Sequence, residues 1–264
     1  MRHKTEQCHQ CVIFPCFCRN VIITMEQDKL PRRASMVASY KQFCPVAMAA
    51  EVLETRWTLL IIRELCLGSK HFNELRRGVP KMSPTLLSKR IRELEDHGIL
   101  TITRTADNKS EYLLTDAGKE LLDVIVSIGS WGKKWISHKH HLESSDEGLL
   151  VWDIRRNFNL ENFPKRNAVM QIRFRGSPAK SANWWFIFSG IDAPDVGPID
   201  PNLDVDLFLE TTLPALTKVW LGEESVSEAI ASDHFILAGE PELIGTFEEW
   251  IGTSNFAGVQ SKIA

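Results

Sequence analysis

The run over residues 83–98 constrains the fold most strongly, because it carries the start signal, the buried face and the stop signal of one helix. Ser83 is a favoured N-cap residue, and Pro84 suits the first helical position. Gly98 is a favoured residue just past a helix end. The apolar residues recur at i, i+4 and i+7 of one face: Leu87, Ile91 and Leu94. The pattern predicts a helix that packs along one side and offers hydroxyl and cationic groups on the other.

Regular elements are also predicted on both sides of this helix. Upstream, apolar periodicity predicts three shorter helices. Downstream, β-branched and alternating residues on either side of the turn residues 106–109 predict a hairpin, and a long helix follows it. The predicted ranges are 45–53, 57–67, 71–77 and 83–98 for the first four helices, 99–105 and 110–115 for the strands, and 115–137 for the last helix.

This order of elements is typical of a winged helix-turn-helix, a mainly α fold in which the second helix of a pair enters the DNA major groove. An exposed helix face often carries cations only as solvated charge, but the complete order of elements favours DNA binding. We expect the recognition helix to use Ser83, Thr85, Ser88, Lys89, Arg90 and Arg92. We expect the hairpin, or wing, to use Arg104, Asn108 and Lys109.

The charge distribution divides the chain into parts suited to different partners. Residues 40–142 contain 16 Lys and Arg against 12 Asp and Glu, whereas residues 143–264 contain 9 against 19. A polyanion such as double-stranded DNA is attracted to the first part and repelled by the second. We therefore expect two domains, at 40–142 and 147–258, joined by a polar linker.

The helical part resembles the HxlR-type winged-helix regulators of bacteria and archaea over about residues 40–135. The resemblance rests on the runs FCP, RWTLLIIREL, HFNELRR, SPTLLSKRIRELE and YLLTDAGKEL, which occur in that order. It implies a homodimer on a palindromic DNA operator, with one recognition helix in each half-site, and it assigns the same DNA contacts to the recognition helix. The long apolar last helix is independently typical of a dimer surface, although such a helix can also cover a neighbouring domain.

Cys44 precedes the first predicted helix, where a helix N-terminus can lower the pKa of a thiol. Some HxlR-type regulators sense oxidants or electrophiles through a cysteine at this place, so the resemblance offers Cys44 as a redox sensor. The alternative is a cysteine that only packs, because free cysteine is among the most buried residue types. Cys66, within an apolar helix, is expected to lie in the core.

The second half of the chain is predicted to be α+β. Strands are expected at 168–175, 184–188, 204–210 and 235–238, and helices at 212–221, 225–231 and 241–250. The run LTKVWLGEESVSEAIASDHFILAGEPELIGTFEEW resembles the C-terminal part of sterol-carrier-protein-like domains. That resemblance implies a pocket for a small hydrophobic ligand. Either plain core packing or the lining of such a pocket accounts for Trp184, Trp185, Phe186, Phe188, Trp220 and Phe235.

Other classes of function find little support. We expect no enzyme, no cofactor and no metal site, because no catalytic triad spacing or phosphate-binding glycine loop occurs. Two groups contain residue types that bind metals, but we expect neither to form a metal site. They are the cysteines at 8, 11, 16 and 18 and the histidines at 138, 140 and 141. Residues 1–39 lack a sustained period and are expected to form a disordered leader. No apolar run approaches the ~20 residues that cross a bilayer, and we expect a cytoplasmic protein.

The sequence therefore predicts a homodimeric transcriptional regulator that responds to a small hydrophobic effector in its C-terminal domain. One alternative keeps DNA binding and makes Cys44 the sensor. Another, from a different class, is a lipid or acyl carrier whose helix-turn-helix serves protein contacts. Steep salt dependence of DNA binding separates the regulators from the carrier, because only phosphate contacts by several cations require it.

Overall fold

The computed structural model describes residues 39–137, 146–164, 166–190 and 193–263. These residues belong to one compact unit over residues 31–264 that contains two hydrophobic core clusters. The proposed leader up to residue 38, its four cysteines and the histidine cluster at 138–141 lie outside the described residues. The domain boundaries 40–142 and 147–258 stay a prediction.

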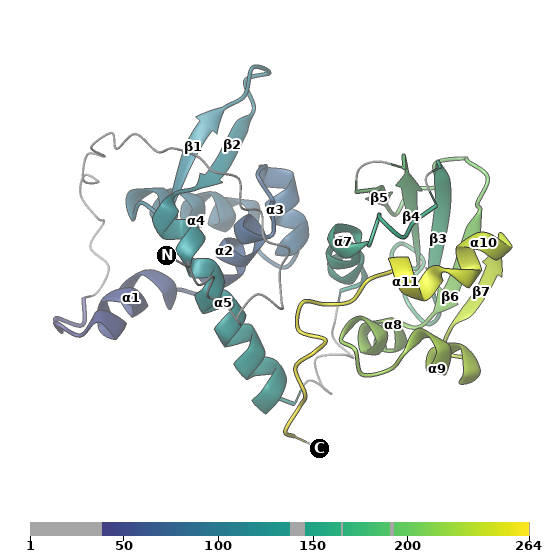
Figure 1. Ribbon diagram of the computed structural model, residues 1–264. Helices are drawn as coiled ribbons and strands as arrows, with labels where there is room; N and C mark the ends of the chain where they lie inside the picture. The colour runs from purple at the N-terminus through teal and green to yellow at the C-terminus, as the bar shows by residue number, and fades with distance from the viewer. Residues whose placement is uncertain (1–38, 138–145, 165, 191–192, 264) are drawn as a thin grey trace, which may run out of the picture. The chain divides into compact units, whose positions relative to one another are not determined.

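The first part of the chain forms five helices and a two-stranded hairpin among its described residues (Figure 1). Their order is that of a winged helix-turn-helix, as the sequence predicts. The elements are α1 (Pro45–Leu53), α2 (Thr58–Cys66), α3 (Phe72–Gly78), α4 (Pro84–Asp96), β1 (Leu100–Arg104), β2 (Ser110–Leu114) and α5 (Asp116–Trp135).

One core cluster holds these elements together. Apolar side chains from α2, α3, α4 and the hairpin meet in it, and Leu121 and Ile125 of α5 pack against it. Ile61 and Ile62 of α2 are fully buried, in keeping with a helix that is apolar on most sides. The close approach of α5 to the end of α4 depends on Gly118, because a Cβ there would lie 2.1 Å from the carbonyl oxygen of Ile99.

The second part of the chain is α+β, as predicted. Its elements are α7 (Glu147–Asn157), β3 (Ala168–Phe174), β4 (Asn183–Phe188), β5 (Asp195–Gly197), β6 (Leu207–Thr211), α8 (Leu213–Trp220), α9 (Val226–Ala231), β7 (Ile236–Gly239), α10 (Pro241–Gly245) and α11 (Phe247–Trp250). The sheet has the order β5-β4-β3-β6-β7 (Figure 1). The pair β3–β6 is parallel, and the other neighbours are antiparallel.

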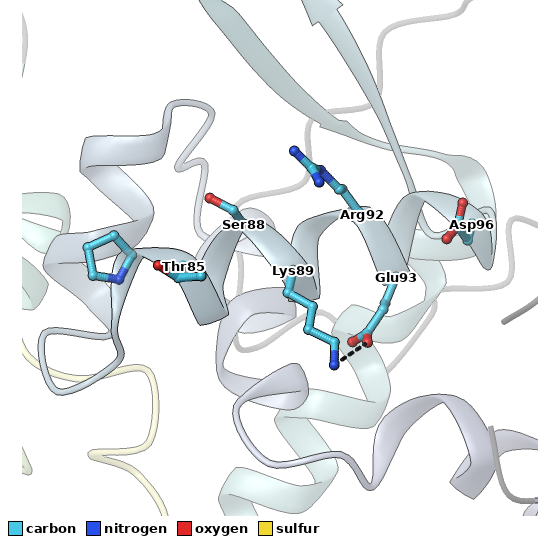
Figure 2. A pocket seen from close by; sticks show the side chains of 7 residues that line it. Thr85, Ser88, Lys89, Arg92, Glu93 and Asp96 are labelled. Atoms are coloured by element: carbon cyan, nitrogen blue, oxygen red, sulfur yellow. Dashed lines mark ion pairs between the residues drawn. The ribbon is translucent and has the colours of Figure 1, made fainter. Parts of the chain in front are cut away.

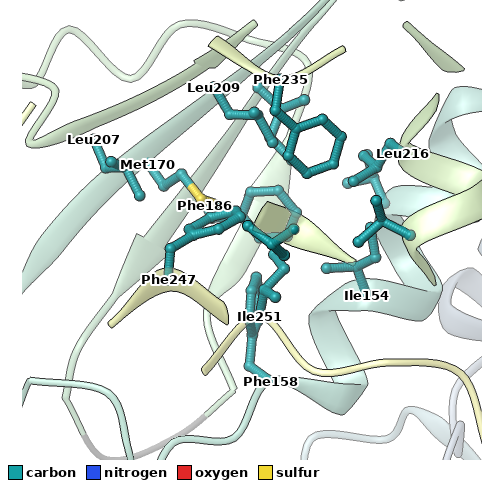
Figure 3. Packing of buried hydrophobic residues seen from close by; sticks show 14 of the residues in the cluster. Ile154, Phe158, Met170, Phe186, Leu207, Leu209, Leu216, Phe235, Phe247 and Ile251 are labelled. Carbon is teal, nitrogen blue, oxygen red and sulfur yellow. The ribbon is translucent and has the colours of Figure 1, made fainter. Parts of the chain in front are cut away.

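One face of this sheet carries the second core cluster. Alternate residues of β3, β4 and β6 point into it, among them Met170, Phe186 and Leu209, and the helices supply Ile154, Leu216 and Phe247 from the other side (Figure 3). Phe158, Phe163 and Phe188 surround the fully buried ring of Trp250 at centroid distances of 5.8, 5.1 and 5.9 Å. The cluster fixes the sheet and helices as one packed body.

Three features of the second part differ from the prediction. The helix α7, which the sequence does not predict, begins at Glu147, at the end of the polar stretch 138–148 that is predicted to be the linker, and the short edge strand β5 is not predicted either. The predicted last helix over 241–250 is two short helices that are separated at Thr246. Leu243, Phe247 and Trp250 are all buried, and Gly245, which weakens a helix interior, lies next to the break.

No described helix combines the length and the apolar character that a membrane crossing requires.

Candidate nucleic-acid interface

Helix α4 is fixed by caps and by one buried stripe. The Ser83 hydroxyl accepts a hydrogen bond of 3.3 Å from the Leu86 amide, which satisfies one of the free donors of the first turn. The stripe Leu87, Ile91 and Leu94 is at most 2% exposed. Burial of this stripe fixes the rotation of α4 about its axis, so the opposite side of the helix faces solvent.

The outward side of α4 carries most of the predicted contact residues. Ser83, Thr85, Lys89 and Arg92 are exposed, and Ser88 is half-buried. Figure 2 shows Thr85, Ser88, Lys89 and Arg92 along one side of the helix, with Glu93 and Asp96 toward its end. These six side chains and Pro84 line a surface depression of about 720 Å³. The structure therefore brings hydroxyl donors and two cations together on one exposed surface.

Arg90 does not share this surface. Its side chain is 16% exposed and pairs with Glu93, and its Nε atom is buried without a partner among the described residues. It lines a small cavity together with Thr58 of α2 and His97. A DNA contact by Arg90 stays a prediction, and it requires this side chain to leave its ion pair.

Acidic residues on α4 moderate the positive charge of its exposed side. The Lys89 ammonium lies 3.9 Å from a Glu93 carboxylate oxygen, and Asp96 lines the same depression. An exposed ion pair at spacing i, i+4 contributes only about 0.3–0.5 kcal/mol. A phosphate group can therefore replace Glu93 as the partner of Lys89 at little cost.

The wing is tied to the helices through its backbone and through Thr115. The Tyr112 amide donates to the Lys70 carbonyl at 2.8 Å, and Nδ1 of His71 lies 3.1 Å from the Ser110 carbonyl oxygen. The Thr115 hydroxyl donates to the Gly98 carbonyl at 2.6 Å, directly after α4. These contacts hold β2 against the start of α3 and fix the base of the hairpin to the end of α4.

The predicted wing residues cluster at the tip of the hairpin and are all exposed. A guanidinium nitrogen of Arg104 donates to the side-chain oxygen of Asn108 at 2.9 Å and to its carbonyl at 3.3 Å. Asn108 has a φ of 60°, a left-handed conformation that Asn tolerates better than most residues. Arg104 and Lys109 thus place two exposed cations at the tip of the hairpin.

Cys44 lies at the N-cap of α1 and is half-buried. The backbone N–H groups of Ala47 and Val46 lower the pKa of its thiol. Cys66 is half-buried and packs against the edge of the core cluster, not within it as expected, and burial raises the pKa of its thiol. The pKa values of the two thiols are therefore shifted in opposite directions. The pKa of Cys44 is lowered, which is typical of a reactive thiol, and that of Cys66 is raised, which is typical of a packed one.

The predicted effector-pocket residues mostly lie in the core. Phe186, Phe188, Trp220 and Phe235 belong to the cluster of the second part, and Trp185 is 9% exposed. Trp184 differs, because it is half-buried and lines a cavity. Among the described residues, no group of three or more His, Cys, Asp or Glu could hold a metal ion.

Comparison with known proteins identifies the first part of the chain. The family model HxlR-like helix-turn-helix matches residues 52–140. The uncharacterized HTH-type transcriptional regulator YvaP of Bacillus subtilis is 35% identical over 98 residues, which are 36% of this chain and 91% of YvaP. The chain belongs to the HxlR-like helix-turn-helix family. Its relatives are transcriptional regulators, so DNA is the partner of the family's shared module.

Other relatives and solved structures match a similar share of this chain. The uncharacterized regulator YybR of Bacillus subtilis is 32% identical over 115 residues, covering 43% of this chain and 90% of YybR. Among solved structures, the reduced form of the regulator YodB from Bacillus subtilis is 32% identical and covers 35% of this chain and 93% of its own, with a TM-score of 0.32. The redox regulator HypR in its reduced form is 31% identical and covers 39% and 100%, with a TM-score of 0.32. The sterol-carrier resemblance of residues 147–258 stays a prediction.

Proposed function

We propose that this HxlR-like protein is a homodimeric regulator that docks the exposed side of α4 in the DNA major groove and the wing on the flanking backbone. The observation that carries the proposal is the division of α4 into a buried apolar stripe and an exposed side with Thr85, Lys89 and Arg92. Hydroxyls near the start of the helix permit close approach to base edges, and the cations further along reach phosphates.

An apolar stripe on α5 supports the dimer. Val124, Ile128, Trp131 and Trp135 recur at i, i+4, i+7 and i+11 and are 39–59% exposed. Near α1, Phe43 and Val46 are 99% and 75% exposed. Apolar groups of this size on two helices of the DNA-binding part are costly to leave in water, so a second copy of this chain is the partner that we propose for them.

Another side of α5 is engaged within the chain. A Cβ at Gly129 would lie 2.3 Å from the ring of Phe256, and the Lys262 amide donates to the Lys134 carbonyl at 2.8 Å. Lys133 pairs with Glu223. The long helix can serve as a dimer surface or cover a neighbouring domain, and these two roles fall on different sides of it. The stripe from Val124 to Trp135 stays available for a partner.

DNA binding to the region upstream of the protein's own gene tests the proposal. Affinity is measured against salt concentration for the full chain, for Lys89→Ala/Arg92→Ala, and for the control Lys119→Ala/Arg173→Ala, which removes the same charge from α5 and β3. We expect tight binding for the full chain and the control. For the α4 variant we expect weaker binding and a slope of log affinity against log salt that is smaller by about 2. Equal slopes in both variants would contradict the placement of α4.

The dimer is tested separately by the molar mass in solution. The variant Ile128→Glu/Trp131→Glu places charges in the α5 stripe and is expected to be monomeric, whereas Leu203→Glu, on an exposed loop of the second part, is expected to leave the dimer intact. A full chain that is monomeric at micromolar concentration would contradict the proposal.

A second candidate function is thiol-based sensing through Cys44, which the lowered pKa of its thiol at the start of α1 favours. α1 lies beside the apolar groups that we assign to the dimer, so a modified thiol there would disturb dimer and DNA binding together. Loss of DNA binding after treatment with diamide in the full chain, but not in Cys44→Ser, would support it. Loss of DNA binding in Cys44→Ser equal to that in the full chain would contradict it, and no loss in Cys66→Ser would then assign the effect to Cys66.

A further inference from the structure

A cavity of about 490 Å³ lies where α3 meets the start of α7 and the strands β4 and β5. This volume is within the range of roughly 300–1,000 Å³ that is usual for small-molecule sites. Its lining includes charges of both signs and indole rings: Arg76, Arg77, Asp146, Glu147, Trp152 and Trp184. The core of the second part accounts for the packing of Trp184, but neither that core nor the exposed surface of α4 accounts for the charged residues.

The charges around the cavity do not neutralise one another. No ion pair within the described part of the chain joins Arg76, Arg77, Asp146 or Glu147 to any acidic or basic partner. The guanidinium of Arg77 lies 5.0 Å from the ring centroid of Trp152. An Asp146 carboxylate oxygen accepts from the Leu149 amide at 3.1 Å and keeps part of its capacity free.

The two signs come from different elements. The guanidinium groups belong to the end of α3, whereas the carboxylates belong to the N-cap and first turn of α7. Both arginines are exposed, and both acidic residues are half-buried. A ligand with only one charge would cover one pair and leave the other pair partly desolvated without a partner, which is costly. Charge complementarity therefore favours a molecule with both a carboxylate and an ammonium group.

The aromatic lining adds a flat apolar surface to the cavity. Trp184 Nε1 donates to the Ser181 carbonyl at 2.9 Å, which fixes the ring. Gly148 lies against the ring, since a Cβ there would be 3.0 Å from Cη2 of Trp184. Trp152 is 4% exposed and already has the guanidinium groups of Arg77, Arg155 and Arg156 over its ring. Trp184, which packs against the core cluster and is half-buried, is therefore the indole ring that we assign to a ligand in the cavity.

From these contacts we infer that the cavity binds an aromatic amino acid or a closely similar zwitterion. Arg76 and Arg77 bind the carboxylate, Glu147 and Asp146 bind the ammonium, and the aromatic ring lies against Trp184. The inference deepens the proposed function, because such a ligand is the effector of the regulator and contacts α3, whose last residues lead directly into the turn before α4. The ligand shifts DNA binding to the extent that it binds the DNA-competent arrangement with a different affinity.

Isothermal titration of the full chain, without DNA, tests the site with three matched probes. L-phenylalanine carries both charges, 3-phenylpropionate lacks the ammonium, and phenethylamine lacks the carboxylate. We expect L-phenylalanine to bind roughly tenfold or more tightly than either single-charge probe. Equal binding of all three, tightest binding of 3-phenylpropionate, or no binding of any probe at millimolar concentration would overturn the inference.

Variants of the lining residues test which side chain binds each charged group of the ligand. Arg77→Gln is expected to abolish the advantage of L-phenylalanine over phenethylamine but to keep its advantage over 3-phenylpropionate. Glu147→Gln is expected to do the reverse. Trp184→Ala weakens the binding of all three probes, and Trp184→Phe restores most of the affinity. Arg173→Gln, at an exposed residue of β3 that does not line the cavity, leaves the affinity unchanged. If Arg77→Gln and Glu147→Gln each lowered the affinity for all three probes equally, the assignment of the two charged groups to these residues would be overturned.

DNA binding is read in a separate titration with and without L-phenylalanine. A changed DNA affinity in the full chain but not in Trp184→Ala supports both the site and its role as effector. Binding of L-phenylalanine with unchanged DNA affinity supports the site and counts against effector control. Failure of DNA binding itself leaves the ligand titration fully interpretable, so the two proposals fail in distinguishable ways.

Discussion

The carboxylate of Glu64 in α2 accepts a hydrogen bond of 2.8 Å from the guanidinium of Arg156 in α7. Glu64 is fully buried, and its other contacts include Arg63 at 2.7 Å and Nε1 of Trp152 at 3.3 Å. The Glu64–Arg156 pair joins a helix of the DNA-binding module to the first helix of the α+β part. Burial of a carboxylate is tolerable only because charged and polar donors surround it.

The variant Arg156→Met is therefore expected to destabilise the protein. It leaves the buried Glu64 carboxylate with fewer donors, and the cost of breaking such a pair is about 3 kcal/mol. The unfolding free energy from urea denaturation checks the prediction. The control Arg173→Met removes an exposed arginine and should change the unfolding free energy by less than about 0.5 kcal/mol. Similar values for both variants would mean that Glu64 has another way to satisfy its charge.

Gly78 leaves the space that the Glu64 side chain occupies. A Cβ at Gly78 would lie 1.9 Å from Cδ of Glu64, whereas a Cβ at Gly132 in α5 meets nothing within 4 Å. We expect Gly78→Ala to cost about 1–3 kcal/mol through overpacking. Gly132→Ala should instead stabilise the helix by about 0.5–1 kcal/mol. Opposite signs in thermal denaturation support the contact at Gly78, and two stabilising substitutions would refute it.

The recognition helix could be predicted because its determinants are local. The Ser83-Pro84 start, the stripe that includes Leu87, and the Gly98 stop are all encoded within a few turns. The position of Arg90 could also have been predicted, because Arg90 is three residues after Leu87 and four before Leu94 and therefore lies beside the buried stripe. Lys89 and Arg92 lie on the opposite side of the helix, and the contacts of Arg90 with Glu93 and with the α1–α2 side agree with this difference.

Helix α7 was missed because it packs on two sides. Val151 and Ile154 face the core of the α+β part, whereas Trp152 and Arg156 face Glu64 and the cavity beside α3. A helix with partners on two sides lacks the single apolar stripe by which an amphipathic helix is recognised. The candidate zwitterion site could not be predicted for a different reason, because its charges come from α3 and α7, which are far apart in the sequence.

The wing variant Arg104→Ala should weaken DNA binding in a salt-dependent way. Arg104 is exposed at the hairpin tip, and its partner Asn108 is a neutral group that a phosphate can replace. Loss of one phosphate contact lowers the slope of log affinity against log salt by about 0.9. Lys119→Ala, also an exposed cation, serves as the control with an unchanged slope. Should both variants show the wild-type slope, the wing makes no phosphate contact.

The two described cysteines should react at different pH. The N–H groups of Ala47 and Val46 lower the pKa of Cys44, whereas burial raises the pKa of Cys66. The thiolate is the reactive form, and its fraction rises as the pH passes the pKa of the thiol. Alkylation of Cys44 by iodoacetamide should therefore reach half of its maximal rate at a lower pH than alkylation of Cys66. Site-resolved mass spectrometry measures both rates in one sample.

The variant Pro45→Gly, which loosens the start of α1, should move the pH at which Cys44 reaches half of its maximal rate, its midpoint, toward that of an ordinary thiol. If the Cys44 midpoint equals or exceeds that of Cys66, the start of α1 does not activate the thiol.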